Sequence, residues 1–363
     1  NSRKGKVFNP ATGEQIAEVE LASKDIVKMA VKNSLQAFAK WSKTTPITRA
    51  RIFSKYKDLL VQNMNELAEL VSKQHGKTIP DAKGSIQRGI EVVEYVTGIT
   101  SSLKGEHSSN VGTNVDSHTL RQPLGVCAGI TPFNFPAMVP MWMFPVAIAC
   151  GNTFVLKPSE KDPSCPLKLA ELAIEAGFPP GVLNCVNGDK ESVDALLDDK
   201  DVQAISFVGS TPIAEYVYHT GTKNNKRIQA LGGAKNHMVI MPDADVEKTT
   251  DAIIGSAFGS AGERCMAISV AVCVGKETNN KIKKSLLEKT SKLNVGPYTD
   301  EKTDFGPLSS EAHYKKVLGY IDSGEKEGAK LLADGRNFKK QGYENGYFVG
   351  PTIFDEVKPE MKI

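Results

Sequence analysis

Short apolar runs alternate with segments of helical periodicity through most of the chain, and this alternation limits the possible fold more than any other feature. The apolar runs are typical of buried strands and cover residues 125–130, 153–156, 182–186, 204–208, 237–241 and 269–274. The helical segments between them cover residues 138–150, 164–176, 191–198, 212–220 and 246–261. Strands that alternate with helices favour a parallel sheet with helices on both faces. The predicted fold class is therefore α/β.

The residues before these runs predict helices followed by an exposed arm. Apolar residues recur at helical spacing over residues 24–43, 47–74 and 86–97. We expect Thr48 to cap the second of these helices and Gly76 to mark its end. Residues 101–123 lose the helical period and are rich in Ser, Gly, Asn and Thr, which is typical of an exposed hairpin or arm.

Length and composition exclude several classes of protein. A chain of 363 residues corresponds to about two domains. With 40% hydrophobic and 24% charged residues, it is neither disordered nor fibrous. The net charge of +3, from 45 basic and 42 acidic residues, is too small to favour a nucleic-acid partner. The longest apolar run, residues 138–150, is shorter than the roughly 20 residues that span a bilayer, so we expect no membrane partner.

The cysteines and histidines favour a reducing compartment and no metal site. The six cysteines form no CxxC pair and are too few for a disulfide scaffold; they are Cys127, Cys150, Cys165, Cys185, Cys265 and Cys273. The six histidines show no HExxH or other ligand spacing, so we expect no bound metal.

Polar residues follow two of the predicted strands, at the end of the strand where ligands bind in such folds. In FVLKPSE (154–160), Lys157 and Glu160 follow a buried strand and could hold the hydroxyls of a ribose. The alternative is a surface turn with an ordinary ion pair.

In ISFVGSTP (205–212), Gly209 permits a tight turn, and Ser210 or Thr211 can cap the next helix. A bare helix N-terminus there would attract a pyrophosphate, and the alternative is an ordinary capped helix.

Glycines elsewhere do not form a phosphate loop. The GxGxxG fingerprint is absent from its usual place after a strand. Gly255, Gly259 and Gly262 lie within a helical pattern among Ala and Ser, and we interpret them as a small-residue face for close packing.

Two further segments suggest a catalytic centre. In AGERCM (261–266), Arg264 beside Cys265 would favour the nucleophilic thiolate; the alternative is a buried structural cysteine. In TPFNFP (131–136), two prolines and two aromatic residues stiffen a loop around Asn134. Its amide could donate to a developing oxyanion, or Asn134 could simply form a turn.

Taken together and in this order, the four segments resemble the aldehyde dehydrogenase superfamily. FNPATG (8–13) and GYFVGPTI (346–353) extend the resemblance along the chain. It implies two doubly wound parallel-sheet domains and a small oligomerisation arm, assembled into a homodimer or homotetramer. The coenzyme domain would comprise residues 1–105 and 124–231, the arm residues 106–123, and the catalytic domain residues 232–363.

The resemblance also implies a role for each candidate residue. Cys265 would be the nucleophile and Asn134 the oxyanion donor. Lys157 and Glu160 would bind the adenine ribose, and Glu160 favours NAD over NADP because a carboxylate repels a 2′-phosphate. The other residues expected around NAD are Phe133, Pro158, Gly209, Ser210 (near the pyrophosphate) and Thr211.

One departure from the family pattern narrows the chemistry. Most members carry Glu-Leu-Gly-Gly, whose glutamate is the base for thioester hydrolysis, whereas this chain has QALGGAKNH (229–237). Either Ala230 or Leu231 then stands at the glutamate position. Without that base water attacks poorly and a stronger nucleophile, such as a thiol, must complete the reaction.

These segments, with GAKNH and GERC, resemble the coenzyme A-acylating, methylmalonate-semialdehyde dehydrogenase branch of the family. Its aldehyde substrates, malonate and methylmalonate semialdehyde, also carry a carboxylate, which Arg264 and Arg88 could clamp. Arg88 could equally be a solvated helix arginine.

Two other functions stay open on the sequence: a hydrolytic, NAD-dependent aldehyde dehydrogenase, and a catalytically silent relative that acts as a binding or structural protein. Family members continue past the position of Ile363, through a Glu-containing segment and a terminal strand, which we expect to lie outside this sequence. The resemblance implies a soluble protein, which would lie in the mitochondrial matrix if it is eukaryotic and in the cytoplasm if it is bacterial.

Overall fold

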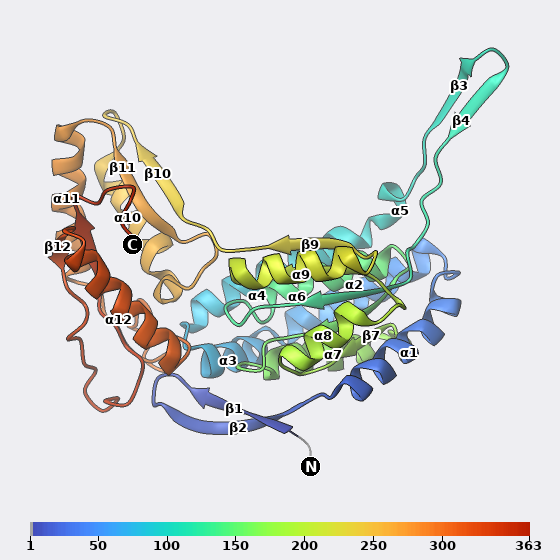
Figure 1. Ribbon diagram of the computed structural model, residues 1–363, viewed down its shortest axis with the longest axis horizontal. Coiled ribbons are helices and arrows are strands. Elements are labelled where there is room, and N and C mark those ends of the chain that lie inside the picture. Colours follow the sequence, from blue (N-terminus) through green and yellow to red (C-terminus); the bar gives the residue numbers. More distant parts are fainter. Residues whose placement is uncertain (1–2) are drawn as a thin grey trace. The chain divides into compact units, whose positions relative to one another are not determined.

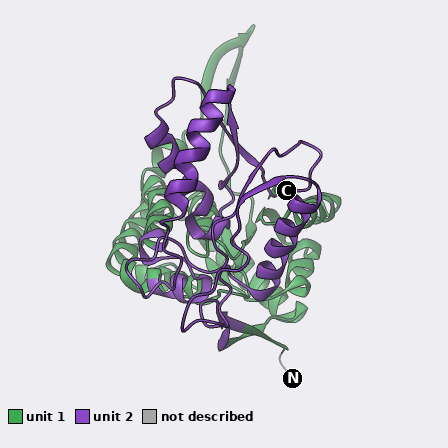
Figure 2. Ribbon diagram, turned by 90° about the vertical axis from the view of Figure 1, so that its left-hand side faces the viewer, with its two compact units in different colours: residues 1–6, 18–68, 83–232 green, residues 7–17, 69–82, 233–363 purple. Residues whose placement is uncertain are grey.

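The computed structural model describes residues 3–363, which divide into two compact units (Figure 2). Unit 1 comprises residues 1–6, 18–68 and 83–232, and unit 2 comprises residues 7–17, 69–82 and 233–363. Strands β1 (Arg3–Asn9) and β2 (Glu14–Leu21) form a two-stranded sheet that the sequence pattern did not predict.

Unit 1 is built on a parallel sheet with the strand order β7-β6-β5-β8-β9. The strands are β5 (Val126–Ile130), β6 (Thr153–Lys157), β7 (Leu183–Cys185), β8 (Val202–Val208) and β9 (Arg227–Leu231). The first four were predicted and β9 was not. The chain moves outward from β5 to β7, returns to β8 beside β5, and moves outward again to β9. The boundary between β5 and β8 is therefore a topological switch point.

Helices cover both faces of this sheet (Figure 1). On one face lie α1 (Lys24–Trp41), α8 (Lys190–Asp198) and α9 (Thr211–Lys223); on the other lie α6 (Met138–Ala149) and α7 (Ser164–Ala176). Val126, Ala128 and Ile130 of β5 belong to the apolar core under the first group of helices. Every residue of β5 and β6 is buried, which explains why these strands appear in the sequence as uninterrupted apolar runs.

The N-terminal helices depart from the predicted bounds. The segment expected as one helix over residues 47–74 forms two, α2 (Pro46–Gln62) and α3 (Met64–His75). Thr45, not Thr48, caps α2, because its side chain accepts a hydrogen bond from the Thr48 amide. Gly76 follows α3 with a φ of +95°, as expected of a residue that ends a helix. The next helices are α4 (Ile79–Thr97), which begins earlier than predicted, and α5 (Ile99–Ser102).

The predicted arm is an antiparallel hairpin of β3 (His107–Gly112) and β4 (Val115–His118). Every residue of both strands is exposed, and Figure 1 shows the hairpin projecting from unit 1. Its role in oligomerisation stays a prediction. Among the described residues, no helix has the length and apolar character needed to cross a membrane.

Unit 2 contains a parallel pair, β10 (Asn236–Ile240) and β11 (Ile268–Cys273), and an antiparallel pair, β12 (Lys330–Ala333) and β13 (Ile353–Asp355). Its helices are α10 (Val246–Phe258), the 3-10 turn η1 (Gly259–Gly262), α11 (Lys276–Thr290) and α12 (Glu311–Lys326). Ile240, Ile253 and Ile282 form an apolar core between β10, α10 and α11. In the described part of unit 2 the parallel sheet has two strands.

Candidate active site

Three predicted loops of unit 1 meet at one edge of its parallel sheet. Residues 131–136 follow β5, residues 158–160 follow β6, and residues 209–211 follow β8. Parallel strands that adjoin one another end at the same edge, and β5 adjoins both β6 and β8. The loops therefore surround the switch point, which is where α/β sheets bind their ligands.

Lys157 is held inside this edge rather than free in solvent. Its side chain lies on the same side of β6 as Val155, is 4% exposed, and donates to the Gly188 carbonyl at 2.6 Å. Its Nζ lies 3.6 Å from Glu160 Oε2. Burial lowers the pKa of Lys157, and the nearby carboxylate of Glu160 opposes that shift. The ion pair considered from the sequence is therefore present, but its lysine is buried rather than on the surface.

The first turn of α9 receives no side-chain cap from Ser210. Ser210 occupies the N-cap position, but its hydroxyl accepts no hydrogen bond from the helix. The Gly209 amide donates to the Leu231 carbonyl at 3.0 Å and so ties this loop to the end of β9. The positive end of the helix dipole and the amides of the first turn favour an anion at this position.

Packing and hydrogen bonds fix the loop that carries Asn134. The Thr131 amide donates to the Lys157 carbonyl at 3.1 Å, which joins this loop to the end of β6. Phe135 is 7% exposed and packs in a small apolar cluster with α6. The ammonium of Lys161 lies 5.0 Å from the centre of the Phe133 ring. Asn134 itself is half-buried on this stiff loop.

In unit 2, Cys265 lies on a tight turn that we call the cysteine turn (residues 259–267). The helix expected to reach residue 261 ends at Phe258, because the chain then turns sharply. Three successive residues are left-handed, with φ values of 56° at Ser260, 52° at Ala261 and 77° at Gly262. Of the six cysteines Cys265 is the only one classed as exposed, so the alternative of a buried structural cysteine is wrong for this residue.

Side chains from other elements hold the cysteine turn. The Asn236 amide donates to the Cys265 and Ala267 carbonyls, each at 3.0 Å. Arg264 pairs with Asp81 of α4, with Nη2 2.9 Å from Oδ2, and donates to the Gly255 carbonyl at 3.0 Å. A side chain at Gly259 would come within 2.6 Å of the Arg264 guanidinium, so the glycine permits this close approach.

The expectation of a small-residue face is correct for only part of the glycine series. A Cβ at Gly255 would meet nothing within 4 Å, whereas Gly259 lies directly against Arg264. Gly262 supplies one of the left-handed residues of the turn. Arg88, the other arginine proposed from the sequence, is exposed on α4.

A buried carboxylate that the sequence did not single out lies next to these residues. Glu263 accepts hydrogen bonds from the Ser309 amide at 3.2 Å, from the Ser309 hydroxyl at 2.9 Å and from His313 Nδ1. His75 Nε2 lies 3.6 Å from the same carboxylate. Because these donors occupy it, Glu263 is not a free base that replaces the missing glutamate.

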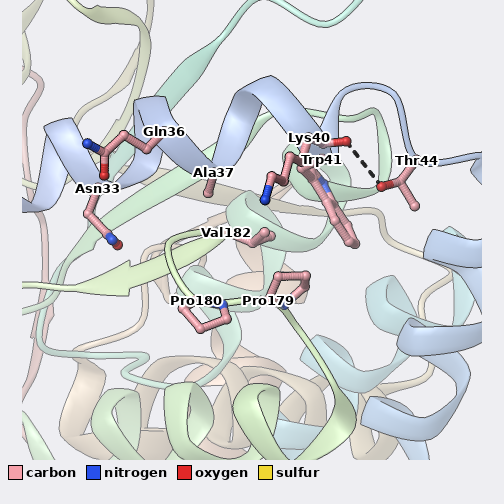
Figure 3. A pocket seen from close by; sticks show the side chains of 9 residues that line it. All are labelled: Asn33, Gln36, Ala37, Lys40, Trp41, Thr44, Pro179, Pro180 and Val182. Atoms are coloured by element: carbon pink, nitrogen blue, oxygen red, sulfur yellow. Dashed lines mark hydrogen bonds between the residues drawn. The ribbon is translucent and has the colours of Figure 1, made fainter.

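A hollow of about 380 Å³ in unit 1 is unrelated to these residues. Figure 3 shows it between the second half of α1 and the turn before β7. Its lining residues are Asn33, Gln36, Ala37, Lys40, Trp41, Thr44, Pro179, Pro180 and Val182. None of these is a candidate from the sequence, so this hollow is not the candidate site.

The exposure of Cys265 predicts selective alkylation. Burial raises the pKa of Cys127 to about 12 and that of Cys185 to about 12, so both stay protonated near pH 7.5. A short treatment with iodoacetamide is expected to modify Cys265 before the other cysteines, as measured by peptide mass mapping. Equal modification of Cys127 or Cys185 would contradict this assignment.

Comparison with known proteins identifies the family of the chain. The sequence model described as the aldehyde dehydrogenase family matches residues 1–363. The malonate-semialdehyde dehydrogenase of Pseudomonas aeruginosa is 55% identical over 363 residues, which are 100% of this chain and 73% of that protein. The malonate-semialdehyde dehydrogenase of Bacillus cytotoxicus is 52% identical over 357 residues, which are 98% of this chain and 73% of that protein.

Solved structures give the same result. The methylmalonate-semialdehyde dehydrogenase of Oceanimonas doudoroffii has a TM-score of 0.98 at 55% identity, over 100% of this chain and 74% of that one. A candidate methylmalonate-semialdehyde dehydrogenase of Sinorhizobium meliloti, solved in complex with NAD, has a TM-score of 0.97 at 57% identity, over 99% of this chain and 73% of that one. The chain belongs to the aldehyde dehydrogenase family, whose members are aldehyde oxidoreductases.

Proposed function

We propose that the protein catalyses the NAD-dependent, coenzyme A-acylating oxidation of malonate or methylmalonate semialdehyde, which yields acetyl-CoA or propionyl-CoA. The observation that carries this proposal is an exposed cysteine on a fixed turn, combined with either Ala230 or Leu231 at the position where a hydrolytic enzyme has its glutamate. The names of the relatives in Pseudomonas aeruginosa and Oceanimonas doudoroffii support the substrate class.

The loops at the carboxyl edge of the unit 1 sheet would bind the dinucleotide. The ammonium of Lys157 and the carboxylate of Glu160 would hold the adenine ribose, and the uncapped turn at Ser210 would face the pyrophosphate. The remaining residues proposed around NAD are Phe133, Pro158, Gly209 and Thr211. NAD would supply the acceptor for the hydride.

Cys265 and Asn134 would carry out the acylation step. The Cys265 thiolate attacks the aldehyde carbon, and the carbonyl oxygen becomes an alkoxide that the Asn134 amide and a backbone N–H stabilise. When the alkoxide collapses, the C–H bond breaks and its electron pair leaves as hydride. The product is an acyl thioester on Cys265.

The release step would need a thiol because neither Ala230 nor Leu231 offers a carboxylate at the position from which a hydrolytic enzyme activates water. In a malonyl-type thioester the bond between the α-carbon and the carboxylate breaks and releases carbon dioxide, which water can hydrate to bicarbonate. The α-carbon keeps the electron pair and takes a proton. The coenzyme A thiolate then attacks the thioester carbonyl and expels the Cys265 thiolate. Coenzyme A is thus a co-substrate, and no step requires a metal.

The substrate carboxylate would bind to arginine. Arg264 is next to the nucleophile, and its guanidinium already binds one carboxylate, that of Asp81. The substrate would use the 30% of the Arg264 side chain that stays exposed, or it would displace Asp81. Arg88 is proposed as the second ligand.

We also propose that the hairpin of β3 and β4 joins subunits of a homodimer or homotetramer.

A product assay tests the proposed function. With propionyl-CoA or acetyl-CoA measured by mass spectrometry, we expect steady NADH formation from either semialdehyde only when coenzyme A is present. Without coenzyme A, one NADH per active site should form rapidly and then stop, because the acyl group stays on Cys265. Continued turnover to the free acid without coenzyme A would favour the hydrolytic enzyme, and no NADH under any condition would favour a silent relative.

A further inference from the structure

We infer that Glu263 is a positioning residue for the nucleophile, and that it acts through a buried cluster with His75, Ser309 and His313. This inference rests on the proposed role of Cys265 and adds residues that no part of the proposed mechanism uses. Glu263 lies two positions before Cys265, so Arg264 alone separates the carboxylate-bearing residue from the nucleophile along the chain.

The cluster joins three separate segments of unit 2. Glu263 is 7% exposed, on the cysteine turn; His75 is 1% exposed, at the end of α3; and Ser309 is 8% exposed, just before α12. The Glu263 carboxylate accepts from Ser309 N, Ser309 Oγ and His313 Nδ1. A buried carboxylate with this many donors has one favoured orientation, because any other would leave charge or donors unsatisfied.

The histidines have different parts in the cluster. Burial, with the nearby charges of Lys77 and His313, lowers the pKa of His75 well below its ordinary value, so its imidazole is neutral at pH 7. It therefore fills the inner side of the cluster without adding charge. His313 is the partly exposed member, with 30% of its side chain accessible, and it bonds to Glu263 directly.

Close backbone packing fixes the segment that brings Ser309. A Cβ on Gly306 would lie 1.9 Å from the Gly76 carbonyl oxygen, so this contact is possible only with glycine. The loop before α12 is thereby seated against the residue after His75. The donors to Glu263 are thus on a rigid base rather than on a mobile loop.

The cysteine turn requires such an anchor. Non-glycine residues in left-handed conformations persist only where surrounding contacts impose them, and Ser260 and Ala261 are two in succession. Glu263 comes directly after Gly262, the third left-handed residue, and fixes the chain after the bend. Loss of the anchor would let the turn relax and move the sulfur away from its position for attack.

The test compares two substitutions of similar size at His313. In His313→Asn the side-chain amide can still donate to Glu263, whereas in His313→Leu no donor remains. We expect His313→Leu and Glu263→Gln to lower the rate constant of the NADH burst by roughly tenfold to a hundredfold. His313→Asn should stay within about threefold of the parent protein. Glu311→Gln is the matched control, because Glu311 is an exposed carboxylate on the same helix that pairs only with Lys315 among the described residues.

Three further measurements separate positioning from general damage. The KM for NAD should change little in His313→Leu and thermal unfolding should stay a single cooperative transition, while hydrogen exchange of the amides of residues 260–267 should become faster. Equal burst rates in His313→Asn and His313→Leu, or unchanged exchange in both His313→Leu and Glu263→Gln, would overturn the inference. Hydrogen exchange needs no substrate, so it tests whether Glu263 anchors the cysteine turn even if the parent protein shows no NADH burst. A parent protein without a burst would count against the proposed function and not against the anchoring.

Discussion

Replacing Cys265 with alanine is expected to abolish NADH formation from malonate and methylmalonate semialdehyde. The variant has no sulfur on the exposed turn, so no covalent adduct can form and hydride transfer has no alkoxide to start from. NAD binding should be unaffected, because the residues proposed to hold NAD all lie in unit 1. NADH formation is measured by absorbance, in the burst and in the steady state. NAD binding is measured by calorimetric titration.

Cys273→Ala serves as the control for this variant. Cys273 is a half-buried cysteine at the end of β11, and burial raises the pKa of its thiol. Its side chain packs beside the apolar core of unit 2 and is not part of the cysteine turn. Removing this thiol should therefore leave turnover close to that of the parent protein. Residual turnover in Cys265→Ala, or its loss in Cys273→Ala alone, would remove Cys265 from the mechanism.

Replacing Asn134 with alanine is expected to lower kcat by about 10²- to 10³-fold, which is the usual effect of removing one preorganised oxyanion donor. The loop should keep its shape, because Phe135 and the hydrogen bond from Thr131 to Lys157 hold it without the amide. The loss should therefore appear in kcat and kcat/KM together, with little change in the dissociation constant of NAD.

An additional measurement makes the assignment of Asn134 specific. Iodoacetamide should alkylate Cys265 at a similar rate in Asn134→Ala and in the parent protein, because alkylation of a thiol develops no oxyanion. An effect on the KM of the aldehyde alone would instead make Asn134 a ground-state binding residue and contradict its role as oxyanion donor.

The sequence predicted those strands whose burial is nearly uniform. β5 and β6 are apolar throughout because both of their faces are covered, and such runs are easily recognised. β9 was missed because Arg227–Leu231 alternates exposed and half-buried residues at the sheet edge. The break between α2 and α3 at Asn63 was missed because no glycine or proline marks it and the apolar period continues past it.

The sequence predicted those candidate site residues that lie on loops directly after the parallel strands. The rule that ligands bind beyond the carboxyl ends of strands located the loops with Asn134, Lys157 and Gly209. It could not locate the partners of the cysteine turn, because these come from distant segments that only the tertiary structure brings together. His75 and Asp81 lie among residues 69–82, which belong to unit 2 although the residues on either side belong to unit 1.

Ser260 and Ala261 also have a consequence for the evolution of the cysteine turn. Each left-handed residue with a side chain costs about 1–3 kcal/mol that glycine would largely avoid, so mutation to glycine at either position is an available route to a more stable chain. That route would widen the range of shapes sampled by the backbone beside the sulfur. Serine and alanine at these positions lower the stability of the chain but restrict the backbone conformations of the cysteine turn. We expect selection to favour these residues over glycine wherever the turnover rate limits fitness.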